Sequence, residues 1–233
     1  MSDDGFADQV SRLAALAEPV RRDLFRYVVD QAEPVSRDQA SAGVGVARHT
    51  AKFHLDKLVE EGLLDTEFRR LSGRTGPGAG RPTKLYRRSG REVSVTVPDR
   101  HYDLAGRLMA GAIEQAGAEG TDVVTALHRV AGEHGAALGR KAREAAGARV
   151  GRAARLDAVR ATLAEHGYEP HAGDGVVTLA NCPFHALARE HTDLVCGMNL
   201  ALVQGLAEQA VGPDLAVRLD PAPGRCCVTL AAT

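Results

Sequence analysis

The sequence has no tryptophan, and aromatic residues make up only 4% of its 233 residues. A surface that stacks many bases on aromatic rings is therefore not expected. There is also no uninterrupted apolar run of the ~18 residues that a membrane-spanning helix needs. The best stretch, Leu194 to Leu206, is broken by Asn199, Gln204 and two glycines. With 44% hydrophobic and 25% charged residues, the composition is typical of a folded globular chain.

The sequence also lacks the motifs of common catalytic sites. It contains no GxSxG, HExxH or phosphate-binding P-loop, and the glycines at 76, 78 and 80 lack the strand-to-helix context of a dinucleotide site. Cys182 and His185 could form a nucleophile and its base, so a Cys-His enzyme is kept as a hypothesis of another class. The sequence favours a protein that is not an enzyme.

Cysteine is scarce and confined to the end of the chain, at Cys182, Cys196, Cys226 and Cys227. An even count indicates disulfides mainly in short secreted chains, and the first residues are acidic where a signal peptide is basic. We therefore expect a cytoplasmic protein with reduced thiols. Clustered thiols in a reducing compartment favour a metal site or redox chemistry.

Hydrophobic spacing predicts one or two helices over residues 6–31, with Pro19 suited to a first helical turn. Ser36 and Gln39 have the spacing of a capping box, which predicts a short helix to about residue 42. A glycine-containing break follows, and then a longer helix over about 47–61 that Gly62 ends. Two helices joined by such a turn form a helix-turn-helix pattern.

Two extended segments, 65–71 and 84–87, flank a run rich in glycine and proline and predict a hairpin with a long tip. Alternating valines predict a strand or extended linker over 93–97 and a domain boundary there. Further helices are expected over 102–116, 123–147 and 153–165 and from about 183 and 194, with strands over 168–171, 176–180, 217–219 and 226–230.

The apolar stripe from Tyr102 to Ala116 fits two interpretations. It is a candidate dimer interface, and it fits an intrachain core equally well. Helical spacing alone does not choose between them.

A formal net charge of -1 argues against a globally basic protein, but the charge is unevenly distributed. Residues 67–91 carry eight basic side chains against one acidic residue, Glu67. Contacts to nucleic-acid phosphates need such a concentration of positive charge, although a solvated hairpin with scattered charge is the alternative. The candidate contacts in this hairpin are Arg69, Arg70, Arg74, Arg81 and Lys84.

The second helix of the helix-turn-helix pattern carries further candidates near its N-terminal end. Arg48, His49 and Lys52 lie off its apolar face, where a helix in the major groove meets base edges and phosphates. Thr50 could bond a phosphate or cap the helix locally. Phe53 could touch a thymine methyl group, but packing under the hairpin is favoured.

Residues 46–64, followed by Gly-Arg-Pro-Thr-Lys-Leu-Tyr at 80–86, resemble the winged helix-turn-helix of ArsR-type bacterial transcription regulators. The resemblance covers residues 10–90 and rests on the order of helix, Gly-Leu-Leu and basic wing. It implies a homodimer that binds palindromic, double-stranded operator DNA.

The predicted elements allow the four thiols to meet at one end of a small α+β domain. Cys182 follows a predicted strand, Cys196 opens a predicted helix, and the Cys226–Cys227 pair opens the last strand. Because successive strand residues face opposite ways, both members of the pair are not expected to bind one ion. Three thiols and a nearby histidine would suit tetrahedral zinc. The alternative is buried cysteines that act as small hydrophobic residues.

Asn-Cys-Pro at 181–183, Asp-Leu-Val-Cys at 193–196 and Arg-Cys-Cys-Val at 225–228 resemble the C-terminal domain of iron-sulfur regulators that repress Suf cluster-assembly operons. The resemblance implies an iron-sulfur cluster, and the cysteine doublet and a histidine at 185 depart from the family pattern. Zinc is kept as an alternative, because thiolates suit both. The implied ligands are Cys182, Cys196 and Cys226, with His185 or Cys227 as the fourth.

The sequence thus predicts an α+β protein in three parts. These are a winged helix-turn-helix domain over 6–97, a helical linker or dimerisation region over 98–150, and an α+β sensing domain over 151–233. The expected function is a transcription repressor whose DNA affinity depends on the cluster. A zinc-binding or thiol-redox regulator of the same fold is the alternative.

Overall fold

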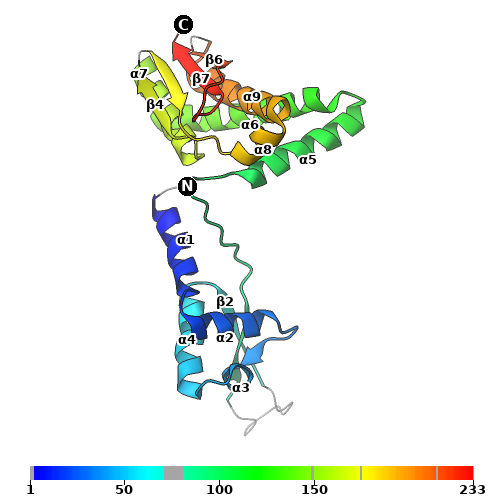
Figure 1. The fold of residues 1–233 in the computed structure, drawn as a ribbon, viewed down its shortest axis with the longest axis vertical. Helices are drawn as coiled ribbons and strands as arrows, with labels where there is room; N and C mark the ends of the chain where they lie inside the picture. Colours follow the sequence, from blue (N-terminus) through cyan, green and yellow to red (C-terminus); the bar gives the residue numbers. More distant parts are fainter. Residues whose placement is uncertain (1–2, 71–80, 148–149, 174, 214, 233) are drawn as a thin grey trace. The chain divides into compact units, whose positions relative to one another are not determined.

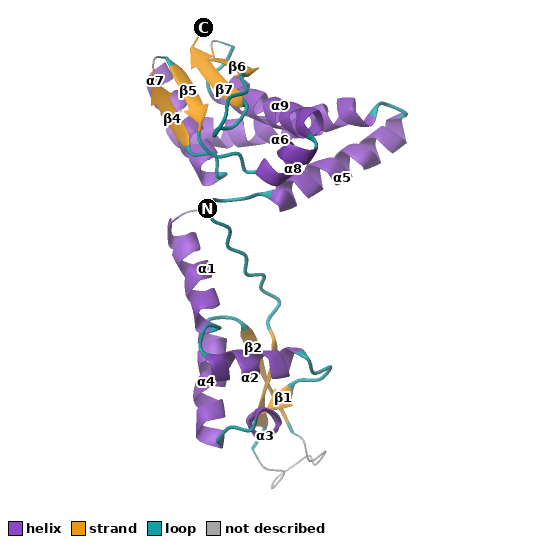
Figure 2. Ribbon diagram, in the orientation of Figure 1, coloured by secondary structure: helices purple, strands orange, loops and turns teal. Residues whose placement is uncertain are grey.

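The computed structural model describes residues 3–70, 81–147, 150–173, 175–213 and 215–232 (Figure 1). The chain divides into one compact unit that ends at Val95 and a second unit over Thr96–Thr233. Each unit has its own hydrophobic core. Both units combine helices with an antiparallel sheet, so the fold is of the predicted α+β class (Figure 2).

The first unit begins with two helices, as the hydrophobic spacing allowed, and Pro19 opens the second of them. The capping box at Ser36 and Gln39 is present, and Gly45 ends the next helix with the positive φ of 75° that glycine adopts without strain. The elements of this unit are α1 (Asp3–Ala15), α2 (Pro19–Val29), β1 (Val35–Ser36), α3 (Arg37–Val44), α4 (Arg48–Glu60), β2 (Leu64–Arg69) and β3 (Thr83–Arg88).

Strand β3 is the centre of a three-stranded antiparallel sheet with the order β1-β3-β2. Tyr86 of β3 pairs with Val35 on one side and with Thr66 on the other. The short strand β1 was not predicted, because two residues are too few to show an alternating pattern. Residues 93–97 form no strand and lie in the linker, the second of the two predicted possibilities.

The second unit is built from helices followed by a four-stranded antiparallel sheet with the order β4-β5-β7-β6. Helix α9 packs on β6 and β7 and also against α6. No helix in the described part of the chain is long and apolar enough to cross a membrane. The elements are α5 (Tyr102–Glu119), α6 (Val123–Ala146), α7 (Arg152–Glu165), β4 (Pro170–Gly173), β5 (Val176–Leu179), α8 (His185–Glu190), α9 (Thr192–Ala210), β6 (Leu215–Leu219) and β7 (Val228–Ala232).

Glycines bring α6 and α9 unusually close together. A Cβ atom on Gly135 or Gly139 would overlap the backbone of α9 at the carbonyls of Leu202 and Leu206. On α9, a Cβ atom on Gly205 would overlap the backbone of α6. The two helices can therefore adopt this spacing only if these positions carry no side chain.

The apolar stripe of α5 belongs to the intrachain core. Leu104, Leu108 and Ala112 are buried in the core of the second unit, whereas Tyr102 and Ile113 are 39% and 61% exposed. Residues 98–150, predicted to be a linker or dimerisation region, thus supply α5 and α6 to the core of the second unit. This decides the interpretation of the stripe in favour of core packing.

Replacing Gly135 by alanine is expected to lower the free energy of unfolding by about 1–3 kcal/mol, because the added methyl group must push α9 away. Gly106→Ala is the matched control, since a Cβ atom at Gly106 of α5 meets nothing within 4 Å. It should raise stability by about 0.5–1 kcal/mol. Urea unfolding followed by circular dichroism measures both, and equal effects would contradict the proposed helix contact.

Candidate nucleic-acid interface and cysteine cluster

Helix α4 exposes the residues predicted to contact DNA. Ala51, Leu55 and Leu58 are buried and fix the inner face of the helix. On the outer face, the side chains of Arg48 and Lys52 are 72% and 63% exposed. His49 is also exposed and Thr50 is half-buried, so the first turns of α4 present a continuous polar surface.

The two exposed cations have only weak partners within the protein. Arg48 Nε lies 3.4 Å from Asp38 Oδ1, and Lys52 Nζ lies 3.4 Å from Asp56 Oδ2. Exposed ion pairs of this kind stabilise a fold by only about 0–1 kcal/mol. Both side chains can therefore exchange these partners for phosphates at little cost.

The basic residues of the hairpin are not equivalent. Arg69 pairs with Glu67 at 2.6 Å and with Glu33 at 3.3 Å, so its charge is largely used within the protein. Arg70 and Arg81 are exposed at the two ends of the described hairpin. Arg74 lies outside the described residues.

Lys84 is tied to α4 rather than directed to solvent. Its Nζ donates to Asp56 Oδ1 at 2.7 Å, and the Tyr86 hydroxyl donates to the same oxygen at 3.0 Å. Burial opposes ionisation of Asp56, but these hydrogen bonds hold its pKa below the ordinary value. Burial and the Asp56 charge raise the pKa of Tyr86. Asp56 thus links α4 to the hairpin, and Lys84 takes part in this link.

The two aromatic residues that follow Lys52 differ in their surroundings. Phe53 is 64% exposed and does not pack under the hairpin, which corrects the favoured prediction. His54 is mostly buried, with Nδ1 3.5 Å from both Arg21 Nε and Glu18 Oε2. His54 thus joins α4 to the start of α2.

The four cysteines approach from three segments of the second unit. Cys182 follows β5, and Cys226 and Cys227 immediately precede β7. The sequence predicted Cys196 at the start of a helix, but Cys196 lies one turn inside α9. Cys196 and Cys226 are buried, and the other two are half-buried.

The thiols form a chain of contacts with Cys226 at its centre. The Cys182 and Cys227 thiols donate hydrogen bonds to the Cys226 sulfur, and this lowers the pKa of Cys226. The same hydrogen bonds and burial raise the pKa of Cys182 and Cys227. Cys227 is also in contact with Cys196. Because the doublet precedes β7 instead of lying in it, the alternation of a strand does not separate Cys226 from Cys227.

A buried polar pair supports the central thiol. Asn199 Nδ2 donates to Cys226 Sγ at 3.3 Å, and the Tyr168 hydroxyl donates to Asn199 Oδ1 at 2.6 Å. Both residues are at most 2% exposed. Neither role was predicted from the sequence, although Asn199 stands three residues after Cys196 in an apolar helix, a spacing that places both on one face.

The predicted histidine ligand, His185, is exposed, whereas the thiols are buried or half-buried. His185 is exposed at the start of α8, and its backbone N–H donates to the Cys182 carbonyl at 3.1 Å. Among the residues that the structure describes, no three His, Cys, Asp or Glu side chains are arranged to hold one metal ion. The soft sulfur donors nevertheless suit iron or zinc by their chemistry.

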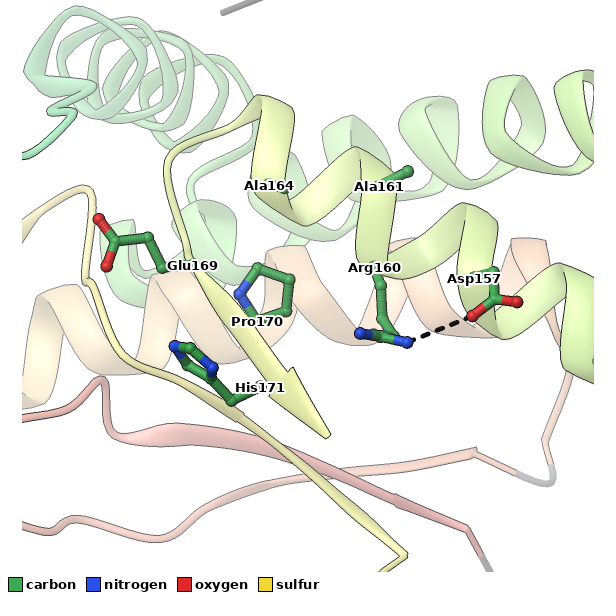
Figure 3. Close-up of a pocket in the computed structure, with 7 residues that line it drawn as sticks. All are labelled: Asp157, Arg160, Ala161, Ala164, Glu169, Pro170 and His171. Atoms are coloured by element: carbon green, nitrogen blue, oxygen red, sulfur yellow. Dashed lines mark hydrogen bonds and ion pairs between the residues drawn. The ribbon is translucent and has the colours of Figure 1, made fainter. Parts of the chain in front are cut away.

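A separate pocket of about 480 Å³ lies between α7 and β4 (Figure 3). In it, Arg160 pairs with Asp157 of the same helix at 3.3 Å, so its charge is already partly neutralised. The pocket contains none of the predicted site residues. It is lined by Asp157, Arg160, Ala161, Ala164, Glu169, Pro170 and His171.

Comparison with protein families gives a match in the first unit. A family described as a helix-turn-helix domain matches residues 16–67, which include α2, α3 and α4. No curated protein matches the chain. The match supports a DNA-binding regulator and favours a role other than catalysis. It covers none of the cysteines.

Asp56→Asn should destabilise the first unit at neutral pH by about 1 kcal/mol, the usual net value of such hydrogen bonds. A carboxyl whose pKa is lowered by folding stabilises the protein above its ordinary value, here 3.8, and loses this effect as the pH falls through the lowered value. The difference between the wild type and the variant should therefore shrink in acid.

Thermal unfolding between pH 7 and pH 2 measures this difference. Asp65→Asn is the control, because Asp65 is exposed on β2 of the same sheet. A difference that stays constant with pH would show that the Asp56 charge does not stabilise the hairpin.

Proposed function

We propose that this protein is a transcription regulator, of the repressor type, that binds double-stranded operator DNA as a homodimer. The observation that carries the DNA-binding part is the exposed row of Arg48, His49 and Lys52 at the start of α4, within the matched helix-turn-helix domain. A helix of this kind enters the major groove by its N-terminal residues. Arg70 and Arg81 of the hairpin add positive charge for the phosphate backbone.

Each side chain has a distinct task in this proposal. Arg48 has the planar donor group that recognises guanine, and Lys52 supplies a point charge for a base or phosphate. Thr50 donates to a phosphate. Phe53, exposed on the same helix, is available to contact a thymine methyl group.

Arg48→Ala and Lys52→Ala should each weaken DNA binding by about tenfold, since one good base or phosphate contact contributes about 1–3 kcal/mol. Lys57→Ala is the matched control. Lys57 lies in the last turn of α4 and pairs with Glu60 and Glu61. The DNA affinity of the Lys57→Ala variant should therefore change by less than about twofold.

Binding is measured by fluorescence anisotropy with a duplex that the wild-type protein selects from a random pool. A random duplex of the same length separates specific from general affinity. If Arg48→Ala and Lys52→Ala bind the selected duplex as the wild type does, α4 is not the recognition helix.

We further propose that DNA affinity is controlled by an iron-sulfur cluster held by the C-terminal cysteines. Support comes from four thiols that form a chain of contacts although they come from three segments, with Asn199 donating to the Cys226 sulfur. Cys182, Cys196 and Cys226 would hold the cluster, and Cys227 is favoured over the exposed His185 as the fourth ligand. Once bound, a cluster supplies a redox-sensitive link between these segments.

The chain itself contributes three things to such a site. Burial of Cys196 and Cys226 limits access of water and oxidants. The amide of Asn199 orients the Cys226 sulfur, and Tyr168 fixes that amide. Zinc bound by the same thiols, or a direct thiol-redox response, would use the same residues, and metal analysis distinguishes these alternatives.

Cys227→Ser should reduce the iron and sulfide content of anaerobically purified protein by at least about half, because loss of one ligand weakens the site. His185→Ala should leave both unchanged. Iron, zinc and acid-labile sulfide are measured together with the visible spectrum. A wild-type protein without iron and sulfide, or a loss of iron only in His185→Ala, would contradict the assignment.

A further inference from the structure

One arginine joins the cysteine cluster to the segment that leads in from the DNA-binding unit. Arg100 Nη1 donates to the carbonyl oxygen of Cys182 at 3.2 Å and also to the side-chain oxygen of Asn181. The same nitrogen donates to the Asp99 carbonyl at 3.1 Å. The guanidinium thus bridges the residues at 99–100 and the loop that carries Cys182.

Asn181 also connects the cysteine loop to the linker end, through its side-chain amide. It is 5% exposed, and its Nδ2 donates to the Asp99 carbonyl at 3.0 Å and to the Gly167 carbonyl at 2.5 Å. Since Asn181 immediately precedes Cys182 in the chain, its side chain holds the linker end against the cysteine loop. A buried amide with all these partners costs free energy when one is removed.

Two further hydrogen bonds extend the same contact. The backbone N–H of His101 donates to the Pro183 carbonyl at 3.1 Å, and the Tyr102 hydroxyl accepts from the backbone N–H of Ala186 at 3.3 Å. Residues 99–102 are therefore bonded throughout to the residues that surround Cys182. By contrast, Cys196 and the Cys226–Cys227 pair belong to α9 and to the residues before β7.

The contact between residues 99–102 and the Cys182 loop lies close to the boundary between the two units. The DNA-binding unit ends at Val95, and the second unit begins at Thr96. Arg100 is the residue whose backbone N–H donates to Thr96 Oγ1 at 2.9 Å. Any displacement of the Cys182 backbone must therefore either break these hydrogen bonds or move the segment that leads to the DNA-binding unit.

We propose that Arg100 and Asn181 are positioning residues that couple the state of the cysteine cluster to DNA binding. This rests on the proposed function, because it requires that the thiols respond to a cofactor. When Cys182 becomes a ligand, its loop shifts, and the Arg100–Asn181 bridge transmits the shift to the linker. By coupling we mean that the protein binds DNA with different affinity when the cysteine site is empty and when it is occupied.

The experiment compares full-length protein in two states, metal-free with reduced thiols and reconstituted anaerobically with ferrous iron and sulfide. The ratio of the two DNA dissociation constants measures coupling, and we expect about tenfold or more for the wild type. Arg100→Met keeps the length of the side chain but removes its donors. It should load iron normally and lower the ratio to less than about threefold.

Arg225→Met is the matched control. Arg225 also donates to a cysteine carbonyl, that of Cys226, at 3.4 Å, but its other partner is Asp220 at 2.7 Å rather than the linker. It should keep the wild-type ratio. Arg100→Lys retains the charge with fewer directed donors, and its ratio should be intermediate.

Hydrogen exchange at residues 99–102 provides a second measurement that does not depend on DNA. Exchange should change between the two states in the wild type and in Arg225→Met, but not in Arg100→Met. A role for Arg100 in folding alone would instead alter both states equally and leave the ratio unchanged.

The outcomes separate the two proposals. A wild-type ratio near one overturns control by the cluster, and the coupling with it. A large wild-type ratio that Arg100→Met retains overturns the coupling alone. Failure of Arg100→Met to load iron also overturns it, because Arg100 would then belong to the cysteine site itself.

Discussion

The close contact between α6 and α9 is the constraint on which the second unit depends. Glycines at 135 and 139 on α6 and at 205 on α9 let the two backbones approach to a distance that side chains would prevent. Helix α9 carries Cys196 and Asn199 and also supports β6 and β7. The helix contact therefore positions one thiol and the donor to another, and it places the sheet whose last strand follows the cysteine pair.

Charge is used differently in the two candidate sites. In the first unit, Asp56 draws Lys84 and Tyr86 to α4, and Glu67 and Glu33 draw Arg69 to the hairpin base. These ionic contacts shape the surface, and they leave the first turns of α4 exposed for a partner. In the second unit the Cys182 and Cys227 thiols donate to the Cys226 sulfur, so their arrangement depends on where the protons lie and on whether a metal is bound.

Much of the fold could be predicted because local rules act over short distances. The capping box at Ser36 and the glycine stop at Gly45 defined α3, and the spacing of Ala51, Leu55 and Leu58 defined the buried face of α4. The positions of the other helices follow from the same periodicity. Strand β1 and the exposure of Phe53 escaped prediction, because both depend on which residues meet across the sheet and the helices, a relation that no local pattern contains.

The sequence by itself determined the α+β class, the helix-turn-helix element with its exposed cations, and the three segments that carry thiols. Only the tertiary structure decided which partners these residues have. It buried the α5 stripe within the second unit, brought the Cys182 thiol to Cys226, and made Asn199, which interrupts an apolar run, a donor to a buried sulfur. It also brought Arg100 to Asn181 and Cys182. These contacts join residues distant in sequence, and their energies depend on burial and direction, which only the packed chain defines.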